Sequence, residues 1–157
     1  KCRIVVEEYG FDACVNYKND NWEEELKAAC PDGIDVYFDN VGGPILDTIT
    51  QQLNLYGKIV LCGLVSQYNR SGDGDFHGHN MGQFVGKRAQ ILGLVVYDYY
   101  DQIDTFLKSA APLVKAGKLN FHEDRAEGLE NTPAHFAKLM SGKNVGKAMV
   151  TIGPEKA

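Results

Sequence analysis

The chain has 157 residues, 16 Lys and Arg against 21 Asp and Glu, and a formal net charge of −5. Its length suits one domain, and its content of 44% apolar and 24% charged residues is that of an ordinary globular protein. These values exclude disordered, collagen-like and disulfide-stapled classes. The acidic excess argues against nucleic acid or an anionic membrane as the main partner, because both need clustered Lys and Arg.

The predicted elements are, in chain order, a helix at 2–9, a strand at 13–17, a helix at 21–30, a strand at 34–39, a helix at 44–53, strands at 58–65 and 90–97, a helix at 100–116, a strand at 120–125, a helix at 132–140 and a strand at 148–152. The strands at 58–65 and 90–97 are nearly all apolar, as strands covered on both faces must be. A polar, Gly-rich loop is expected from Ser66 to Gly82. Alternating strands and helices of this kind predict an α/β fold with a doubly wound parallel sheet.

Cysteine usage points to a reducing compartment. The four cysteines are Cys2, Cys14, Cys30 and Cys62, and their spacing contains no C-x-x-C pair, which excludes a zinc ribbon and a thioredoxin-like motif. Cys14 and Cys62 lie in apolar, strand-like runs, where a buried free thiol is common. We therefore expect reduced thiols and a cytoplasmic location, and no apolar run approaches the length of a membrane span.

Ligands of an open parallel sheet bind at the carboxyl ends of its strands, so the polar residues after each strand are candidates. Gly42-Gly43 fits either a plain strand-to-helix turn or a close approach to a ligand, and spacing alone favours the turn. The Asn40 amide fits a ribose or carboxamide contact as well as a backbone contact within its own loop. Tyr68 has the chemistry to hold a carbonyl oxygen, although position alone favours a partly buried aromatic side chain.

Motifs for other kinds of chemistry are missing or weak. His77 and His79 are spaced i, i+2 in the polar loop, and a solvated loop is a better interpretation than a metal site. The sequence has no G-x-S-x-G, no G-x-x-x-x-G-K-[ST] and no H-E-x-x-H. The glycine-rich dinucleotide fingerprint is absent too, so a Rossmann-like interpretation must explain the lack of its first phosphate-binding turn.

Several blocks stand in a recognisable order: Lys1-Cys2, Gly10–Ala13 with Asn16–Lys18, Gly33–Gly43, Leu61–Gly63, Ser66–Asn69, Glu127–Asn131 and Gly142–Lys147. Together they resemble the zinc-independent medium-chain reductases of the prostaglandin reductase type, over nearly the whole chain. The resemblance implies NADPH as cofactor and no metal. It also implies hydride transfer to the β-carbon of an α,β-unsaturated ketone or aldehyde, of the 15-keto-prostaglandin or 2-alkenal type, with a proton reaching the α-carbon.

Carried over residue by residue, the resemblance makes Lys1 a ligand of the cofactor's 2′-phosphate and places Tyr17 beside that phosphate and the adenosine. It makes Asn40 a cofactor contact and Tyr68 the catalytic tyrosine beside the nicotinamide ribose and the substrate carbonyl. A phenol in that position stabilises the negative charge that develops on the carbonyl oxygen. The further cofactor contacts that it implies are Cys62, Gly63, Ser66, Gln67, Val95, Val96, Tyr97 and Asn144.

The resemblance also predicts the domain organisation. Residues 1–118 would form a Rossmann-like nucleotide-binding domain without its first strand and glycine turn. Residues 119–157 would return to a GroES-like catalytic domain, and residues 94–96 would lie near the sheet edge that pairs in a homodimer. A polypeptide of only these 157 residues is expected to have little reductase activity and very weak NADPH binding. The alternatives are an NADPH quinone reductase of the same superfamily and a non-catalytic dimerisation or binding fragment.

Overall fold

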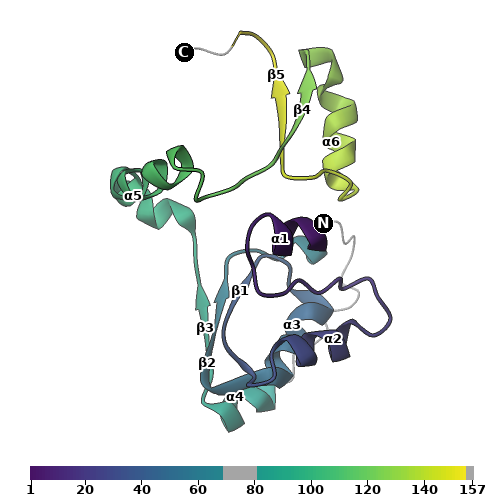
Figure 1. Cartoon of the computed structure of the whole chain (residues 1–157). Helices are drawn as coiled ribbons and strands as arrows, with labels where there is room; N and C mark the ends of the chain where they lie inside the picture. The colour runs from purple at the N-terminus through teal and green to yellow at the C-terminus, as the bar shows by residue number, and fades with distance from the viewer. Residues whose placement is uncertain (69–80, 155–157) are drawn as a thin grey trace. The chain divides into compact units, whose positions relative to one another are not determined.

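The computed structural model describes residues 1–68 and 81–154 (Figure 1). The chain forms two compact units, one of residues 15–104 and the other of residues 1–14 and 105–157. The loop expected at 66–82 is described only at its ends, where Val65–Gln67 form a 3-10 turn and Met81 begins a helix. Asn69, His77 and His79 lie outside the described residues.

The unit of residues 15–104 is a three-stranded parallel sheet with helices. Its elements are α2 (Trp22–Ala29), β1 (Ile34–Asp39), α3 (Gly43–Gln52), β2 (Leu53–Leu61), the 3-10 turn η1 (Val65–Gln67), α4 (Met81–Lys87), β3 (Gln90–Gly93) and the 3-10 helix η2 (Val96–Gln102). The strands follow the order β1-β2-β3, and both pairings are parallel. The predicted α/β class with a parallel sheet is therefore confirmed.

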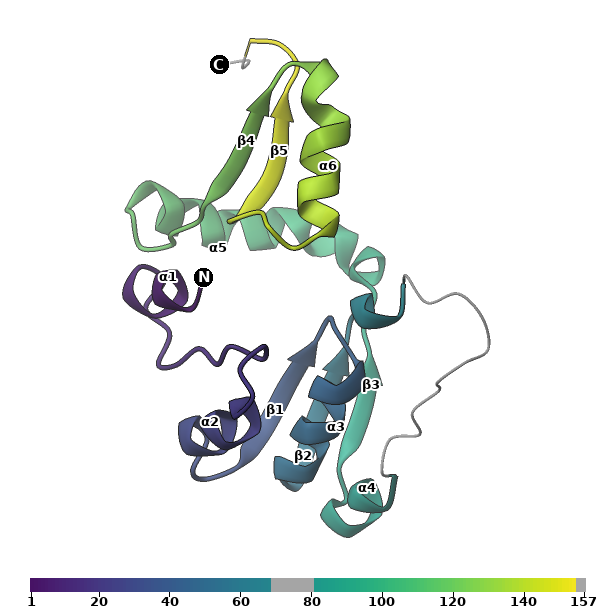
Figure 2. The ribbon, with the colours of Figure 1, turned by 90° about the vertical axis from the view of Figure 1, so that its right-hand side faces the viewer.

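One face of this sheet carries the core. Ile34, Leu46, Ile49, Leu53 and Ile59 form a buried cluster that joins the sheet to α3. Figure 2 shows α3 lying across the sheet on this face. Pro44 near the start of α3 favours a helix from this point, as the sequence predicts.

The opposite face of the sheet is open in the part of the chain that the structure describes. Phe38, Val60 and Leu92 are paired across β1, β2 and β3 and so share one face. Phe38 is 55% exposed, whereas Ile59, on the core face, is fully buried. The prediction that both faces are covered concerns the strands at 58–65 and 90–97, and it is wrong for residues 90–93, all of which are exposed.

Two predicted strands differ from the structure. Residues 13–17 form no strand, because they have no partner in a ladder; Figure 2 shows the irregular chain between α1 (Cys2–Glu7) and α2. The strand predicted at 90–97 stops at Gly93, which pairs with Leu61 at the end of β2. Beyond Leu61 the chain turns away, so residues 94–97 have no strand to pair with. Residues 94–96 therefore follow the edge strand rather than belonging to it, and the homodimer stays a prediction.

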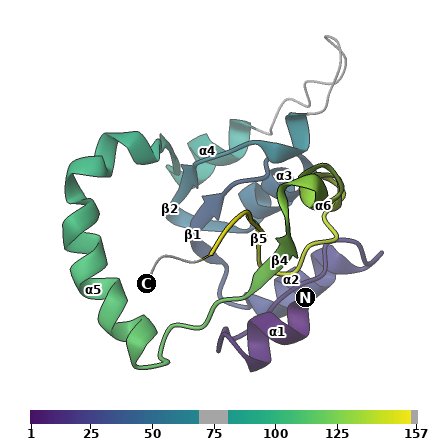
Figure 3. The same cartoon turned by 90° about the horizontal axis from the view of Figure 1, so that it is seen from above.

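The remaining strand boundaries shift by a few residues; β2, for example, begins at Leu53 rather than at residue 58. The second unit contains a separate pair of parallel strands. In the second unit β4 (Glu123–Glu127) and β5 (Lys147–Thr151) pair in parallel. Between them come the 3-10 turn η3 (Leu129–Asn131) and α6 (Thr132–Met140), which packs against β5 (Figure 2, Figure 3).

The helix α5 (Ile103–Lys115) begins at the boundary between the units. The compact units thus divide at residues 14/15 and 104/105, and the predicted domain boundary after residue 118 stays a prediction. Within residues 1–68 and 81–154, no helix has both the length and the apolar character that crossing a bilayer requires.

Candidate functional site

The loops that follow β1 and β2 are hydrogen-bonded to one another at the carboxyl end of the sheet. The backbone N–H groups of Cys62 and Gly63 both donate to the carbonyl oxygen of Asp39, at 2.8 and 3.1 Å. The next links run from Val65 N to Asn40 O and from Ser66 N to Val41 O, both at 3.1 Å. Candidate residues that are far apart in the sequence therefore lie in two adjoining loops.

The carboxylate of Asp39 accepts the hydrogen bonds that hold the start of the loop after β1. It is fully buried, and its Oδ1 atom accepts hydrogen bonds from Val41 N at 2.8 Å, Gly42 N at 2.9 Å and the Tyr37 hydroxyl at 3.0 Å. Burial and the neighbouring Asp39 carboxylate raise the pKa of Tyr37 above its usual value, which keeps this phenol protonated as a donor. Sequence reasoning did not single out Asp39, and its only signal was a carboxylate at the end of an apolar strand.

The Gly42-Gly43 pair makes the turn from β1 into α3. Both residues have positive φ angles, +69° and +63°, which side chains disfavour. A Cβ atom at Gly42 would lie 2.6 Å from Leu64 Cδ2, and one at Gly43 would lie 3.0 Å from Ser66 Oγ. The backbone of this glycine pair therefore packs closely against the loop after β2. These contacts support the interpretation as a turn that spacing favours.

Ser66 holds the loop after β2 against the loop after β1. Its hydroxyl donates to the Val41 carbonyl oxygen at 2.6 Å, next to the backbone bond between the same two residues. Gln67 Nε2 lies 3.7 Å from the Cβ position of Gly42. The structure thus places the predicted residues Ser66 and Gln67 against the glycine turn, while the neighbouring Asn40 side chain is exposed.

A cavity of about 310 Å³ opens at the carboxyl ends of β2 and β3. Its lining consists of Leu61, Cys62, Gly63, Leu64, Tyr68, Gly93, Leu94 and Val95. Four of the residues predicted to contact the cofactor, namely Cys62, Gly63, Tyr68 and Val95, are among them. The walls are mainly apolar, with one phenol hydroxyl.

The Tyr68 hydroxyl accepts a long hydrogen bond of 3.4 Å from Leu64 N. Among residues 1–68 and 81–154, no acceptor takes the proton of this hydroxyl, and the side chain is 68% exposed. A Cβ atom at Gly63 would lie 3.4 Å from the hydroxyl oxygen and 3.2 Å from Asn40 O. The tighter of the two contacts is the one to Asn40 O, so a side chain at Gly63 would press mainly on the loop after β1, while the Tyr68 hydroxyl lies at ordinary contact distance from this position.

The other predicted residues lie farther from this cavity or in the second unit. Tyr17 is exposed in the segment before α2, and Val96 and Tyr97 begin η2, where the Tyr97 ring meets Tyr100 edge-on. No hydrogen bond, ion pair or ring contact among the described residues joins Tyr17, Val96 or Tyr97 to the loops after β1 and β2.

In the second unit, the structure brings Lys1 to the loop that contains Asn144. Lys1 Nζ donates to Gly142 O at 2.8 Å, and Asn144 Nδ2 donates to Gly146 O at 2.8 Å. Both predicted residues thus belong to one small region of this unit, although they stand at opposite ends of the sequence.

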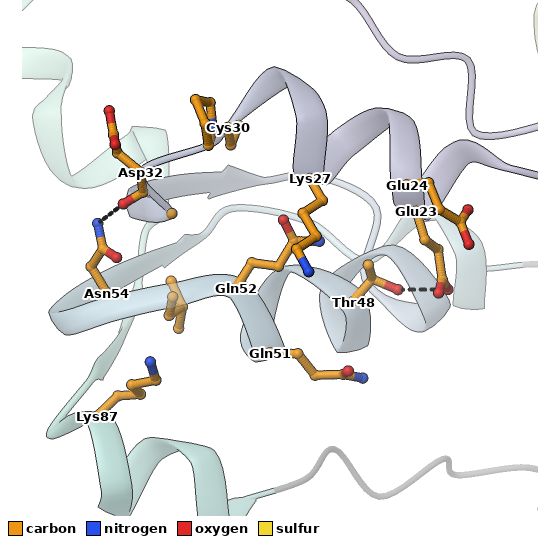
Figure 4. Close-up of a pocket in the computed structure, with 13 residues that line it drawn as sticks. Glu23, Glu24, Lys27, Cys30, Asp32, Thr48, Gln51, Gln52, Asn54 and Lys87 are labelled. Atoms are coloured by element: carbon orange, nitrogen blue, oxygen red, sulfur yellow. Dashed lines mark hydrogen bonds between the residues drawn. The ribbon is translucent and has the colours of Figure 1, made fainter.

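A larger cavity, of about 710 Å³, lies at the opposite end of the sheet (Figure 4). It is lined by residues of α2 and α3, the turn before β1, the start of β2, and Lys87. Two hydrogen bonds, Thr48 Oγ1 to Glu23 Oε1 at 3.0 Å and Asn54 Nδ2 to Asp32 O at 2.9 Å, occupy part of its polar lining. None of the predicted site residues lines it, so it is not the candidate site.

Known proteins resemble this chain in sequence and in fold. A family model described as zinc-binding dehydrogenase matches residues 3–113. The chain is 40% identical over 159 aligned residues to an NADP(+)-dependent 2-alkenal reductase of Nicotiana tabacum, covering 99% of this chain and 45% of the relative. It is 37% identical to the NADPH-dependent curcumin reductase of Escherichia coli, covering 97% of this chain and 45% of the relative.

Among solved structures, the crystal structure of CurA in complex with NADPH from Vibrio vulnificus matches with a TM-score of 0.89 at 34% identity. The match covers 98% of this chain and 47% of CurA, and it confirms that the fold is the Rossmann-like part of such enzymes. The chain thus spans about half the length of the relatives that it matches.

The family model's name refers to zinc. Within the described residues, no group of three or more His, Cys, Asp or Glu side chains is placed to hold a metal ion. The match over residues 3–113, together with the parallel sheet and the loops at its carboxyl end, shows that the chain belongs to the zinc-binding dehydrogenase family of the medium-chain dehydrogenase/reductase superfamily.

Proposed function

We propose that the protein reduces the carbon–carbon double bond of α,β-unsaturated ketones or aldehydes with NADPH, and that this chain is its cofactor-binding part. The observation that carries the proposal is the Tyr68 hydroxyl at the wall of an apolar cavity, held beside Gly63 at the carboxyl ends of β2 and β3. Similarity to a 2-alkenal reductase and a curcumin reductase supports the reaction type.

The cavity suits the nicotinamide half of the cofactor. Leucine and valine side chains line it, and Gly93 contributes backbone alone; a Cβ atom there would meet nothing within 4 Å. A flat, uncharged ring gains from such apolar walls. NADPH, when bound, supplies the hydride, and the chain's own residues hold and orient the reactants.

The residues that we propose to hold NADPH are those that the family resemblance implies. Asn40, Cys62, Gly63, Ser66, Gln67, Tyr68, Val95, Val96 and Tyr97 follow the strands of the three-stranded sheet, with Tyr17 preceding it. Lys1 and Asn144 belong to the second unit. A Lys ammonium still has two N–H donors after bonding one carbonyl, so Lys1 retains donors for a 2′-phosphate. The domain assignment, 1–118 for nucleotide binding and 119–157 for the catalytic domain, belongs to the same proposal.

The role of Tyr68 in this proposal is to stabilise the negative charge that forms on the carbonyl oxygen of the substrate. Hydride addition to the β-carbon of an enone moves negative charge onto the carbonyl oxygen. A hydrogen bond from the Tyr68 hydroxyl to that oxygen stabilises the charge where it develops. The hydroxyl oxygen accepts a bond from Leu64 N, which leaves its own proton free to be donated to the substrate oxygen.

The test uses the full-length protein with NADPH or NADH and three substrates: a 2-alkenal, a 15-keto-prostaglandin and a small quinone. We expect NADPH oxidation with an enone and a product with a saturated carbon–carbon bond and an intact carbonyl. Reduction of the quinone alone, formation of an allylic alcohol, or turnover of none of the three would contradict the proposal.

The Lys1 assignment has its own test. Lys1→Ala should raise KM for NADPH by about tenfold and leave KM for NADH unchanged, because one charge-assisted contact to the 2′-phosphate is lost. Lys27→Ala, in α2 and outside the proposed contacts, is the matched control. Equal effects on the two cofactors would remove Lys1 from the phosphate site.

A further inference from the structure

Tyr68 lies at the end of the short 3-10 turn η1 (Val65–Gln67). Its backbone N–H donates to Val65 O at 3.4 Å, and its hydroxyl accepts a bond from Leu64 N, also at 3.4 Å. Hydrogen bonds of this length are weak, and the side chain is exposed. The position of the Tyr68 ring therefore depends on how firmly η1 itself is held.

Ser66, the middle residue of η1, joins the turn to the loop after β1 by two hydrogen bonds to one oxygen atom. Its backbone N–H donates to Val41 O at 3.1 Å, and its hydroxyl donates to the same oxygen at 2.6 Å. Ser66 is half-buried, and a hydrogen bond is stronger where water is partly excluded. Its Oγ atom also lies 3.0 Å from the position that a Cβ atom of Gly43 would take, so the hydroxyl fits closely against a glycine.

Val41, which accepts these bonds, is itself fixed to the end of β1. Its N–H donates to Oδ1 of the fully buried Asp39 at 2.8 Å. Both polar groups of the Val41 backbone are therefore engaged, the N–H with Asp39 and the carbonyl with Ser66. A continuous series of hydrogen bonds thus leads from the sheet through Val41 and Ser66 to the turn that carries Tyr68.

We propose that Ser66 is a positioning residue for Tyr68: the bond from its hydroxyl to Val41 O fixes η1 so that the Tyr68 hydroxyl meets the carbonyl oxygen of the substrate. The inference rests on the proposed function, in which Tyr68 donates to that oxygen. A donor stabilises a developing oxyanion only from hydrogen-bond distance, so the placement of the turn affects the rate. The hydroxyl of Ser66 has one proton, which Val41 O accepts, so toward a cofactor it can act only as an acceptor.

The first test is kinetic and uses the full-length protein. Ser66→Ala removes the hydroxyl bond and keeps the backbone bond to Val41. We expect kcat for the enone to fall by about fivefold to tenfold and KM for NADPH to stay within about twofold, because alignment of the donor matters in the transition state. Ser66→Thr keeps a hydroxyl on the same carbon and should restore most of kcat. The matched control is Ser109→Ala, which removes a hydroxyl bond to Thr105 O in α5 and should leave kcat unchanged.

A double-mutant cycle separates positioning from other roles of Ser66. In Tyr68→Phe there is no hydroxyl left to position, so adding Ser66→Ala should lower kcat no further. Equal losses with and without the Tyr68 hydroxyl would mean that Ser66 acts on the fold or on the cofactor, and so would an increase in KM for NADPH without a loss of kcat. Either result would overturn the proposal while leaving the proposed function intact.

Hydrogen exchange, measured by mass spectrometry on the full-length protein, tests the positioning without the reaction. The amides of residues 65–68 should exchange about fivefold faster in Ser66→Ala than in the parent protein, because one hydrogen bond that closes the turn is lost. In Ser109→Ala they should exchange at the parent rate. Unchanged exchange in Ser66→Ala would overturn the positioning role even where the parent protein reduces enones. Faster exchange in a protein that reduces no enone would instead contradict the proposed function, and with it the role of Ser66.

Discussion

Tyr68 and Gly63 both lie in the loop after β2, and the Tyr68 hydroxyl is in contact distance of the Gly63 position. This hydroxyl accepts a hydrogen bond from Leu64 N and has no acceptor for its own proton among the described residues. On the sequence alone, a partly buried aromatic was the better interpretation of this position. The structure shows an exposed side chain at the wall of a cavity instead. Position along the chain could not reveal this, because the loop's path depends on hydrogen bonds to residues 39–41.

Replacing Tyr68 tests its role directly. Tyr68→Phe should lower kcat/KM for the enone by about tenfold to a hundredfold, since the ring stays and only the donor to the developing oxyanion is lost. The measurement is steady-state NADPH oxidation by the full-length protein. Tyr56→Phe, the same change at an exposed tyrosine outside the cavity, should leave kcat/KM unchanged. An unaltered rate in Tyr68→Phe would exclude the hydroxyl from catalysis.

Asp39 acts through the backbone of its neighbours. Asp39→Ala would leave two backbone N–H groups and the Tyr37 hydroxyl without their acceptor in a buried place. We expect a loss of about 3 kcal/mol in the free energy of unfolding, measured by urea denaturation. Asp39→Asn, which keeps one side-chain oxygen as acceptor, should lose less. Equal losses for the two variants would argue against the hydrogen bonds as the cause.

At the scale of elements, Asp124 ties β4 to both α6 and the chain before β5. Lys138 Nζ lies 2.6 Å from Asp124 Oδ2, and Val145 N donates to the same oxygen at 3.0 Å. The backbone carbonyl of Asp124 lies 2.8 Å from Nε2 of the buried His135. One residue of β4 thus positions the helix and the strand that follow it.

This arrangement makes the unit sensitive to acid. The hydrogen bond from Lys138, and after it the one from Val145, lower the pKa of Asp124 in the folded state. The contribution is therefore present above the usual Asp pKa of about 4, and it is lost as the pH falls through the lower, folded value. Asp124→Asn should flatten the dependence of unfolding free energy on pH in this acid range.

The control is Lys143→Gln, which removes a charge in the same unit but none of the bonds to Asp124. It should retain the acid dependence of the parent protein. If Asp124→Asn and the parent protein lose stability in parallel as the pH falls, another carboxylate is responsible.

The existence of the helices and strands was predicted more accurately than the residues at which they begin and end. The helix at 44–53 was signalled by Pro44 after two glycines, and the structure has α3 at Gly43–Gln52. The apolar run at 90–97 reads as one strand, yet only 90–93 pair, because β2 turns away after Leu61 to bond with Asp39. Strand length depends on the partner, which local sequence does not contain.

At the scale of the whole molecule, the chain of 157 residues contains no glycine-rich dinucleotide fingerprint. That fingerprint normally places backbone N–H groups against the pyrophosphate. We therefore expect the 157-residue chain by itself to bind NADPH only weakly, even at millimolar concentration, and to show little reductase activity.

Isothermal titration calorimetry on the 157-residue chain and on the full-length protein tests this expectation. The full-length protein should bind NADPH far more tightly. Micromolar affinity of the 157-residue chain would mean that the residues after β1, β2 and β3 suffice to hold the cofactor.

The sequence by itself determined which segments are helices or strands for most of the chain, the parallel α/β class, and the turn at Gly42-Gly43, because periodicity and backbone conformation are local properties. The sequence motifs, taken together, also indicated the medium-chain dehydrogenase/reductase superfamily. Only the tertiary structure decided where strands end, that Asp39 is buried beneath the loops, and that the face with Phe38, Val60 and Leu92 is open in the described chain. Each of these depends on contacts between residues apart in the sequence, which no local pattern of side chains encodes.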